Sequence, residues 1–323
     1  MTFPPIPEFI FDDLAQVEQI IRERLEPQSA VLRTARQHLF GAGDKRLRPA
    51  LTLLCAQLGN YSLERVLHAA AAVELIHLAS RVHDDLIDEA ERRRGTPTTY
   101  NRWSGNVALM VGDYLFALAA SEMALAPDPR IIAYFSQGVM TICEGELAPV
   151  TTVTPAQTAI DQYLYKIGCK TAALFEAGSK AGVVCGGGAQ HEIDLAGRYG
   201  YDLGMATQIM EDVFDVAGAP QQPDTLAGGG LRAGVITLPL IYAVADGADP
   251  RLAAVIEQEQ PDEATIAWAC GEIRRVGGDQ RARADAQTFA QRAVTRLDGF
   301  PPSRARSALT ELAVFIGQLD GRV

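Results

Sequence analysis

Apolar residues recur at helical spacing along most of the chain. A first stripe near the N-terminus consists of Leu14, Val17, Ile21 and Leu25. Further helical patterns cover residues 47–58, 62–88, 131–147, 157–184, 193–216, 238–244, 265–276, 284–297 and 303–319. The sequence shows no convincing strand alternation and no hairpin signal. We therefore predict an all-α fold of long helices around a common core, with residues 1–323 forming a single domain.

The amino-acid composition disfavours some classes of binding partner. Of the 323 residues, 48% are hydrophobic and 21% are charged, so the chain can bury a large core. The net charge of −11 disfavours non-specific binding to nucleic acid or to an anionic membrane. We therefore expect small-molecule substrates and no nucleic acid partner.

The cysteines and the N-terminal residues indicate in which cellular compartment the protein is expected. The five cysteines show neither metal-ligand spacing nor a disulfide framework. Residues 1–13 lack the basic segment and apolar run of a signal peptide. We see no apolar stretch that approaches the ~20 residues needed to span a bilayer. These features predict a cytoplasmic protein with no transmembrane segment.

Two acidic clusters stand in otherwise apolar helical patterns. The first contains Asp84, Asp85 and Asp88, and the second contains Glu211, Asp212 and Asp215. In each cluster the first and third acids are four residues apart, so on a helix they project from one face. Oxygen ligands of this kind suit Mg²⁺, which is usually shared with substrate phosphates. Two such clusters across a cavity would bind a diphosphate through Mg²⁺, and the alternative is that each cluster is a solvated helix face.

Basic motifs accompany the acidic clusters. They comprise Lys45, Arg46 and Arg48 in one segment, Arg92, Arg93 and Arg94 directly after the first acidic cluster, and Lys170 followed by Thr171 in an apolar segment. Arginine binds phosphate oxygens in a bidentate way, whereas lysine acts as a point charge. We expect these cations to bind diphosphate. Alternatively, one of the three consecutive arginines pairs with Asp88, Glu89 or Glu91.

Taken together, these motifs resemble the trans-isoprenyl diphosphate synthases, also called polyprenyl synthetases, over residues 43–239. The segment HDDLIDEAERRRGTPT at residues 83–98 is very similar to the first aspartate-rich region of that family. Its other motifs are matched by GDKRLRP at residues 43–49, Glu74-x-x-His77, Lys170-Thr171 and Thr237-Leu238-Pro239. The resemblance implies an isoprenoid-synthase-type bundle of long helices around a central apolar cavity.

The resemblance also implies a reaction. An allylic diphosphate bound through Mg²⁺ ionises to a carbocation, the double bond of isopentenyl diphosphate attacks it, and a proton is lost. It implies that isopentenyl diphosphate is bound by Lys45, Arg48, His77 and Arg94. It also implies that Arg93 and Lys170 bind the allylic diphosphate, and that Thr171 and Gln208 face the cation. The family further implies a homodimer.

Departures from the family pattern gather in the second half of the chain. Thr207 stands in place of a phenylalanine, Glu211 in place of an aspartate, and Val235 in place of a lysine. They leave open a weak or inactive subunit of a heteromeric prenyl synthase and, as a less favoured alternative, a class I terpene cyclase. The intact first cluster favours an active synthase, and the second cationic set around Lys45 argues against a cyclase.

Small residues precede the first acidic cluster. Ala79 lies five residues before Asp84, about 7.5 Å along a helix axis, and Ser80 lies four before it on the same face. In the family that the chain resembles, a bulky aromatic residue at the position of Ala79 closes the product tunnel. Its absence implies a product longer than C20. Alternatively, Ala79 allows a neighbouring helix to pack closely, and Leu115 or Phe116 closes the tunnel deeper down.

Overall fold

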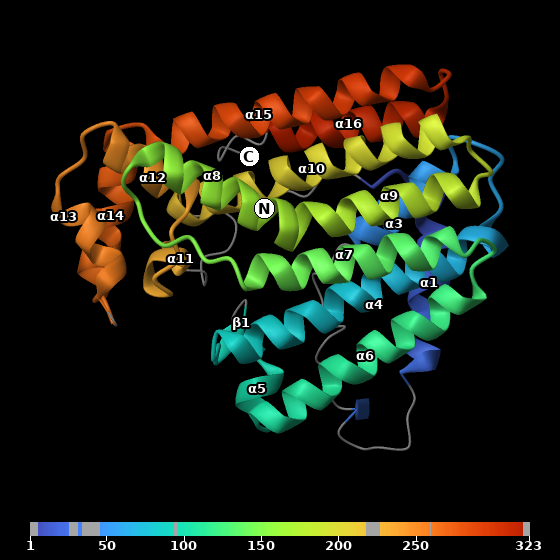
Figure 1. Ribbon diagram of the computed structural model, residues 1–323, viewed down its shortest axis with the longest axis horizontal. Coiled ribbons are helices and arrows are strands. Elements are labelled where there is room, and N and C mark those ends of the chain that lie inside the picture. Colours follow the sequence, from blue (N-terminus) through green and yellow to red (C-terminus); the bar gives the residue numbers. More distant parts are fainter. Residues whose placement is uncertain are drawn as a thin grey trace.

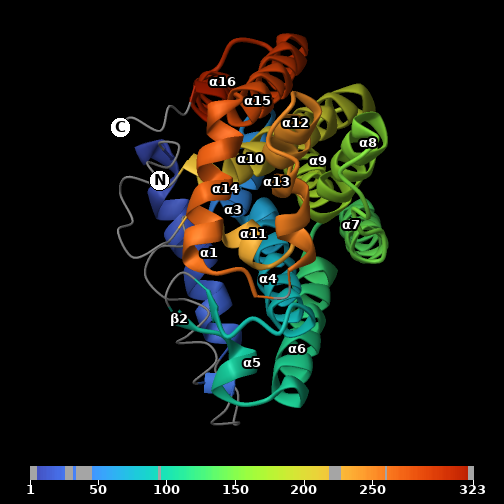
Figure 2. The same ribbon diagram turned by 90° about the vertical axis from the view of Figure 1, so that its left-hand side faces the viewer.

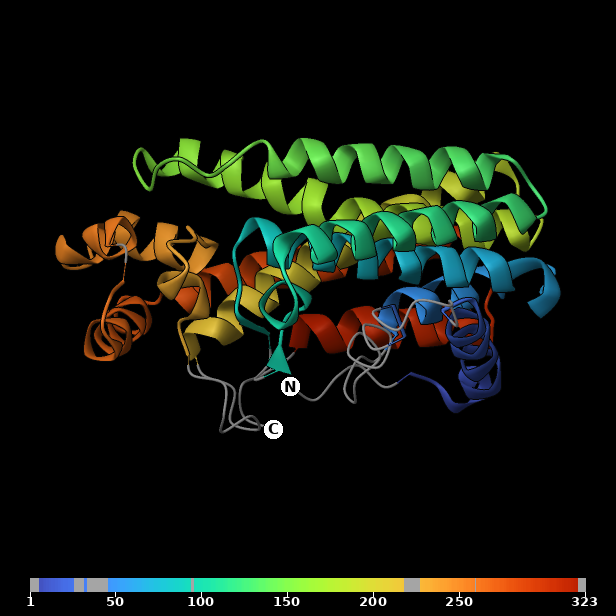
Figure 3. The same ribbon diagram turned by 90° about the horizontal axis from the view of Figure 1, so that it is seen from below.

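The long helices lie side by side in one bundle, as three views of the computed structural model show (Figures 1, 2 and 3). The structure describes residues 6–25, 32–33, 46–93, 96–217, 227–258 and 260–318, and for residue 93 the backbone alone. The predicted all-α fold is confirmed.

The helices follow one another along the chain with short connections. The α-helices are α1 (Phe11–Arg24), α3 (Leu47–Ala56), α4 (Leu63–Ile87), α5 (Thr99–Arg102), α6 (Gly105–Leu125), α7 (Arg130–Glu146), α8 (Ala156–Ile167), α9 (Ala173–Cys185), α10 (Gln190–Ala217), α11 (Gly229–Arg232), α12 (Leu238–Ala245), α13 (Arg251–Ala254), α14 (Glu263–Arg275), α15 (Gly278–Arg296) and α16 (Arg304–Gln318). Four short elements are η1 (Glu8–Ile10), η3 (Val255–Glu257) and η4 (Leu297–Gly299), which are 3-10 turns, and η2 (Gly168–Ala172), which is a π-helical turn.

The helices α4 and α10, which carry the acidic clusters, run through the middle of the bundle. Helix α4 packs along α6 and also touches α3 and α9, and helix α10 packs along α9 and α15. Both end at the left-hand side of the bundle in Figure 1, near β1 and α11, and this end faces the viewer in Figure 2. The fold therefore brings both clusters to one end of the molecule.

A minimal hairpin follows α4. Strand β1 (Arg92–Arg93) pairs antiparallel with β2 (Thr96–Pro97). The sequence shows no hairpin signal at this point, because two-residue strands are too short to give an alternating pattern.

Helix α6 has apolar residues on every side, including Leu109 and Met110 on its exposed side. By length and composition alone it is the one helix in the described part of the chain that qualifies as a possible membrane span, and 39% of its apolar window is buried. This contradicts the expectation that no apolar stretch approaches 20 residues.

The crossing of α9 and α10 leaves no room for a side chain at Gly200. A Cβ atom there would lie 2.5 Å from the carbonyl oxygen of Phe175 and would also collide with the hydroxyl of Ser179. That hydroxyl already donates a hydrogen bond of 2.9 Å to the same carbonyl. Gly200 therefore sets how closely α10 approaches α9.

A buried ion pair anchors the start of α3. The guanidinium of Arg46 donates to Glu74 Oε1 of α4 at 2.6 Å and to Glu18 Oε1 of α1 at 3.1 Å. Arg46 and Glu74 are only 5% and 2% exposed. Arg46 also has left-handed backbone angles, φ 52° and ψ 38°, which are uncommon for a residue with a side chain. The ion pair holds this conformation and joins three helices beside Arg48.

The tight crossing predicts that Gly200→Ala lowers the free energy of unfolding by about 1–3 kcal/mol, because the backbone of α9 has to move. The matched control is Gly271→Ala in α14, where an added Cβ meets nothing within 4 Å. The control should leave stability unchanged or raise it by up to about 1 kcal/mol. Chemical denaturation measures both, and equal stability of the two variants would contradict this account of the crossing.

The buried ion pair predicts that Glu74→Gln lowers the free energy of unfolding by about 2 kcal/mol, because it removes the nearer of two carboxylates and leaves the buried Arg46 charge with the more distant one of Glu18. The control is Glu263→Gln, whose carboxylate pairs with Arg232 at 2.7 Å in an exposed position. That change should cost less than about 1 kcal/mol. Urea titration of both variants is the measurement, and a smaller loss at Glu74 than at Glu263 would exclude the anchoring role.

Candidate active site

The first acidic cluster lies at the C-terminal end of α4. Asp85 is buried, Asp84 is partly buried and Asp88 is exposed at the helix end. Asp84 Oδ2 is 3.3 Å from Lys170 Nζ, and the same nitrogen is 2.6 Å from Glu146 Oε1. Burial disfavours the charged ammonium, but Asp84, Glu146 and Asp88 outweigh burial and raise the pKa of Lys170. Lys170 therefore stays charged and partly neutralises the cluster.

The sequence analysis did not select Glu146 as a site residue. It ends α7, and Gly145 beside it allows α7 to approach η2 so closely that a Cβ atom would collide with Cys169. The signal that could have identified it is the segment Glu-Gly-Glu at residues 144–146, at the end of an apolar helical pattern.

Lys170 and Thr171 both lie in η2, the π-helical turn between α8 and α9. Such turns insert an extra residue into a helix and are frequent at functional sites. The Thr171 hydroxyl donates to Gln208 Oε1 of α10 at 2.8 Å. The two residues thus connect different helices, with Lys170 contacting α4 and α7 and Thr171 contacting α10.

In the second cluster, the carboxylates of Asp212 and Asp215 accept hydrogen bonds from the protein. Asp212 Oδ2 accepts from the Tyr163 hydroxyl at 2.6 Å, and Asp212 Oδ1 accepts from Gln208 Nε2 at 3.1 Å. Burial raises the pKa of Asp212 to about 7, although both hydrogen bonds act to lower it. The Asp215 carboxylate accepts from two backbone N–H groups of α11, those of Gly229 and Gly230, each at 2.9 Å. The remaining acid, Glu211, has an exposed side chain.

A continuous path of contacts joins the two acidic clusters. It runs from Asp84 to Lys170, passes to the adjacent Thr171, and continues through Gln208 to Asp212. The structure therefore brings one acid of each cluster together with Lys170, Thr171 and Gln208, three of the residues that the sequence analysis selected. Tyr163, which holds the far end of this path, was not predicted.

The other expected basic residues are described only in part. The Arg48 guanidinium lies over the Phe175 ring at 4.8 Å, near the start of α3. His77 lies on α4 two helical turns before Asp84, so both project from the same side of the helix. Arg93 is described by its backbone alone, and Lys45 and Arg94 lie outside the described residues.

The small residues expected along the product path lie on two sides of α4. Ala79 is fully buried. His83, one turn later on the same side, packs on Phe116 of α6 with ring centres 5.6 Å apart. Ser80 is partly buried and lies on the side of Asp84. Ala79 is therefore on the side that packs against α6, whereas Ser80 is on the side of the acidic cluster.

The donor groups of the site fit Mg²⁺ in their chemistry. Within the ranges that the structure describes, no three histidine, cysteine or acidic side chains lie close enough together to hold a metal ion. The Lys170 ammonium between Asp84 and Glu146 shows that this position favours a cation. Because Mg²⁺ usually keeps several waters and binds substrate phosphates, one or two carboxylates from each helix would suffice.

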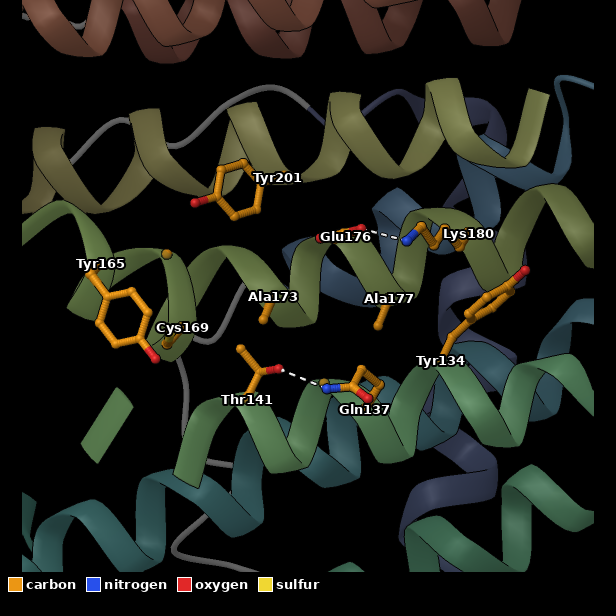
Figure 4. Close-up of a pocket in the computed structure, with 12 residues that line it drawn as sticks. Tyr134, Gln137, Thr141, Tyr165, Cys169, Ala173, Glu176, Ala177, Lys180 and Tyr201 are labelled. Atoms are coloured by element: carbon orange, nitrogen blue, oxygen red, sulfur yellow. Dashed lines mark hydrogen bonds and ion pairs between the residues drawn. The ribbon is translucent and has the colours of Figure 1, made fainter. Parts of the chain in front are cut away.

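A hollow lies between α7 and α9 (Figure 4). Tyr134, Tyr165 and Tyr201 line it, together with an ion pair between Lys180 and Glu176. None of the residues expected at the active site is among its lining residues. This hollow is therefore separate from the path that joins the acidic clusters.

Comparisons with known proteins agree with this geometry. The model of the family described as polyprenyl synthetase matches residues 29–273. Heptaprenyl diphosphate synthase component 2 of Geobacillus stearothermophilus is 37% identical over 314 residues, which cover 97% of each chain. Nonaprenyl diphosphate synthase of Mycobacterium tuberculosis is 33% identical over 307 residues, which cover 93% of this chain and 91% of the relative.

Solved structures show the same relationship. A polyprenyl synthase from Caulobacter crescentus, complexed with calcium and isoprenyl diphosphate, superposes with a TM-score of 0.90 at 32% identity and 97% coverage of both chains. A decaprenyl diphosphate synthase from Rhodobacter capsulatus gives a TM-score of 0.87 at 33% identity, covering 97% of this chain and 98% of the other. The chain is therefore a prenyltransferase that belongs to the polyprenyl synthetase family.

Proposed function

We propose that this chain condenses isopentenyl diphosphate with an allylic diphosphate to give a trans-polyprenyl diphosphate and pyrophosphate. The observation that carries the proposal is the path of contacts from Asp84 through Lys170, Thr171 and Gln208 to Asp212. It joins carboxylates, an ammonium and neutral polar groups in one chain of contacts. Membership of the family supports the same reaction. One contiguous apolar core from Ile10 to Ile316 supports a single domain.

In this proposal the acidic clusters bind the diphosphate leaving group through Mg²⁺. Asp84 and Asp88 from α4 and Glu211 from α10 would hold the metal, with Asp85, Asp212 and Asp215 also in the clusters. When bound, Mg²⁺ would neutralise charge on the leaving pyrophosphate and so favour cleavage of the C–O bond. Lys170 adds a fixed positive charge 3.3 Å from Asp84.

The remaining polar residues bind the second substrate and face the cation. Arg48 and His77, with Lys45 and Arg94, would bind isopentenyl diphosphate, and Arg93 would join Lys170 on the allylic diphosphate. Thr171 and Gln208 would face the allylic cation as its C–O bond breaks. The double bond of isopentenyl diphosphate then attacks and the product loses a proton. The surrounding apolar helices exclude water that would otherwise capture the cation.

The direct test is to incubate the purified chain with Mg²⁺, isopentenyl diphosphate and allylic primers of several lengths, and to separate the products by chain length. The proposal expects elongated prenyl diphosphates. Hydrolysis or cyclisation of the primer without elongation would overturn it in favour of a hydrolase or a terpene cyclase. Elongation only after a second polypeptide is added would show the heteromeric alternative.

The heteromeric alternative rests on two observations. Heptaprenyl diphosphate synthase component 2 is by its name one part of a larger enzyme. In addition, Val235, 42% exposed, offers no charge where the family pattern has a lysine. Against this alternative stand the complete first cluster and the path from Asp84 to Asp212, so we favour a chain that is active by itself.

We further propose a homodimer formed through α6 and α7, which pack against each other. Large apolar side chains stand exposed on these two helices: Leu109, Met110, Ile132, Met140 and Leu147. A surface patch of this kind on a helix pair is typical of protein interfaces. A second copy would cover the apolar side of α6 and so explain its composition without a membrane. Five free cysteines fit a reducing compartment, and we place the enzyme in the cytoplasm.

We also propose a product longer than C20. Ser80 leaves the side of α4 that carries Asp84 without a large side chain, and Ala79 does the same on the side that faces α6, which supports a deep apolar tunnel. The names heptaprenyl, nonaprenyl and decaprenyl among the relatives support this proposal. Because Ser80 lies on the side of the acidic cluster, we expect it to border the tunnel more directly than Ala79.

The proposed leaving-group site predicts that Asp84→Asn lowers kcat at least about a hundredfold, or about 2.7 kcal/mol, because a charge that would bind Mg²⁺ is lost. The control is Asp161→Asn on the exposed side of α8, where the carboxylate accepts only from Gln157 at 2.8 Å. Steady-state kinetics should show normal turnover for the control. Near-normal turnover of Asp84→Asn would place the diphosphate elsewhere.

The proposed homodimer predicts that Met110→Asp together with Met140→Asp converts a dimer into a monomer, because two charges would be buried at the contact. Sedimentation velocity over a range of concentrations is the measurement. Val314→Asp, at an exposed apolar position on α16, is the control and should remain dimeric. A wild-type chain that is monomeric at all concentrations, or a dimeric double variant, would exclude this interface.

The proposed tunnel predicts that Ser80→Phe and Ala79→Tyr each shorten the main product by at least one isoprene unit, because the new ring blocks the growing chain. Product lengths from chromatography check this, with Ala284→Tyr on the exposed side of α15 as the control. If both variants make the wild-type product, the floor of the tunnel lies deeper, at residues such as Leu115 or Phe116.

A further inference from the structure

Both carboxylate oxygens of Asp212 accept hydrogen bonds from side chains of the protein. The Tyr163 hydroxyl donates to Oδ2 at 2.6 Å, and Gln208 Nε2 donates to Oδ1 at 3.1 Å. Tyr163 is only 2% exposed, and it lies on α8, the helix that precedes the π-helical turn η2. Glu211 beside it is exposed to solvent.

These bonds fix the orientation of the Gln208 amide. Of the two polar atoms of the Gln208 amide, it is the nitrogen that lies against Asp212 Oδ1, and an amide nitrogen can only donate a hydrogen bond. The nitrogen of Gln208 must therefore face Asp212, and its oxygen must face Thr171. The reversed amide would set its oxygen against the Asp212 carboxylate, which is repulsive.

The orientation of Gln208 in turn fixes the hydroxyl of Thr171. Gln208 Oε1 can only accept, so Thr171 has to donate its single hydroxyl proton to it, at 2.8 Å. Both lone pairs of the Thr171 oxygen are then left for other groups. An oxygen that presents lone pairs stabilises a nearby positive charge, whereas one that presents its proton does not.

We propose that Tyr163 and Asp212 are positioning residues that fix the direction of the hydrogen bonds through Gln208, so that Thr171 presents its lone pairs to the allylic cation. In this assignment Asp212 binds no metal. The inference rests on the proposed function, because it assumes that the cation forms beside Thr171.

The central test is a double-mutant cycle between Tyr163→Phe and Thr171→Val, read as the single-turnover rate of the first condensation. We expect Tyr163→Phe to lower this rate at least tenfold, and to have less than a twofold further effect once Thr171→Val is present. Two residues that act through one network show such coupling, whereas independent losses multiply. Tyr165→Phe, two residues later on α8 and 52% exposed, is the matched control and should keep the wild-type rate.

Two binding measurements separate positioning from structural damage. Binding of an unreactive thio-analogue of the allylic diphosphate should stay within twofold of wild type in Tyr163→Phe. Calorimetric titration of Mg²⁺ with inorganic pyrophosphate should be unchanged in Asp212→Asn and weakened at least tenfold in Glu211→Gln. If Tyr163→Phe fails to fold, the cycle is run with Asp212→Asn in its place.

The outcomes distinguish this inference from the proposed function. A wild-type chain that does not condense the two substrates overturns the proposed function and this inference with it. An active wild type with a normal rate in Tyr163→Phe, or with rate losses that multiply in the double variant, overturns the inference alone. Loss of Mg²⁺ binding in Asp212→Asn would show that Asp212 is a metal ligand.

Discussion

Carboxylates that face one another inside an apolar helical bundle repel, and burial makes each of them costly. The structure compensates this cost with its own groups. The Lys170 ammonium lies between Asp84 and Glu146, and backbone N–H groups cover Asp215. Asp212 is held by a phenol and an amide. The bundle can therefore fold around two acidic clusters before any cation or diphosphate binds.

The same compensation gives the site its directionality. The charged groups of Lys170 and Glu146 meet on the side of Asp84, whereas Thr171 and Gln208 form a neutral link that leads to Asp212. The π-helical turn η2 makes this division possible because it directs two consecutive residues, Lys170 and Thr171, toward different helices.

The sequence was sufficient to predict the all-α fold and the two acidic clusters, because apolar periodicity and four-residue spacing depend on local geometry alone. It was not sufficient for α6, which is apolar on all sides and so shows no helical period. It also could not identify Glu146 or Tyr163, since each reaches the site from a helix whose position depends on tertiary packing. The buried pair of Arg46 and Glu74 was missed for the same reason, whereas the hairpin after α4 was missed because its strands are too short to show an alternating pattern.

The central claim is that acids from α4 and α10 act on one diphosphate. The most direct measurement is a crystal structure of the chain grown with Mn²⁺ and inorganic pyrophosphate, with the metal located by its anomalous scattering. The account predicts metal bound to pyrophosphate oxygens, to Asp84 or Asp88, and to Glu211, with Tyr163 still bonded to Asp212. Metal and pyrophosphate bound away from both clusters, with Lys170 still paired to Asp84 and Glu146, would contradict it.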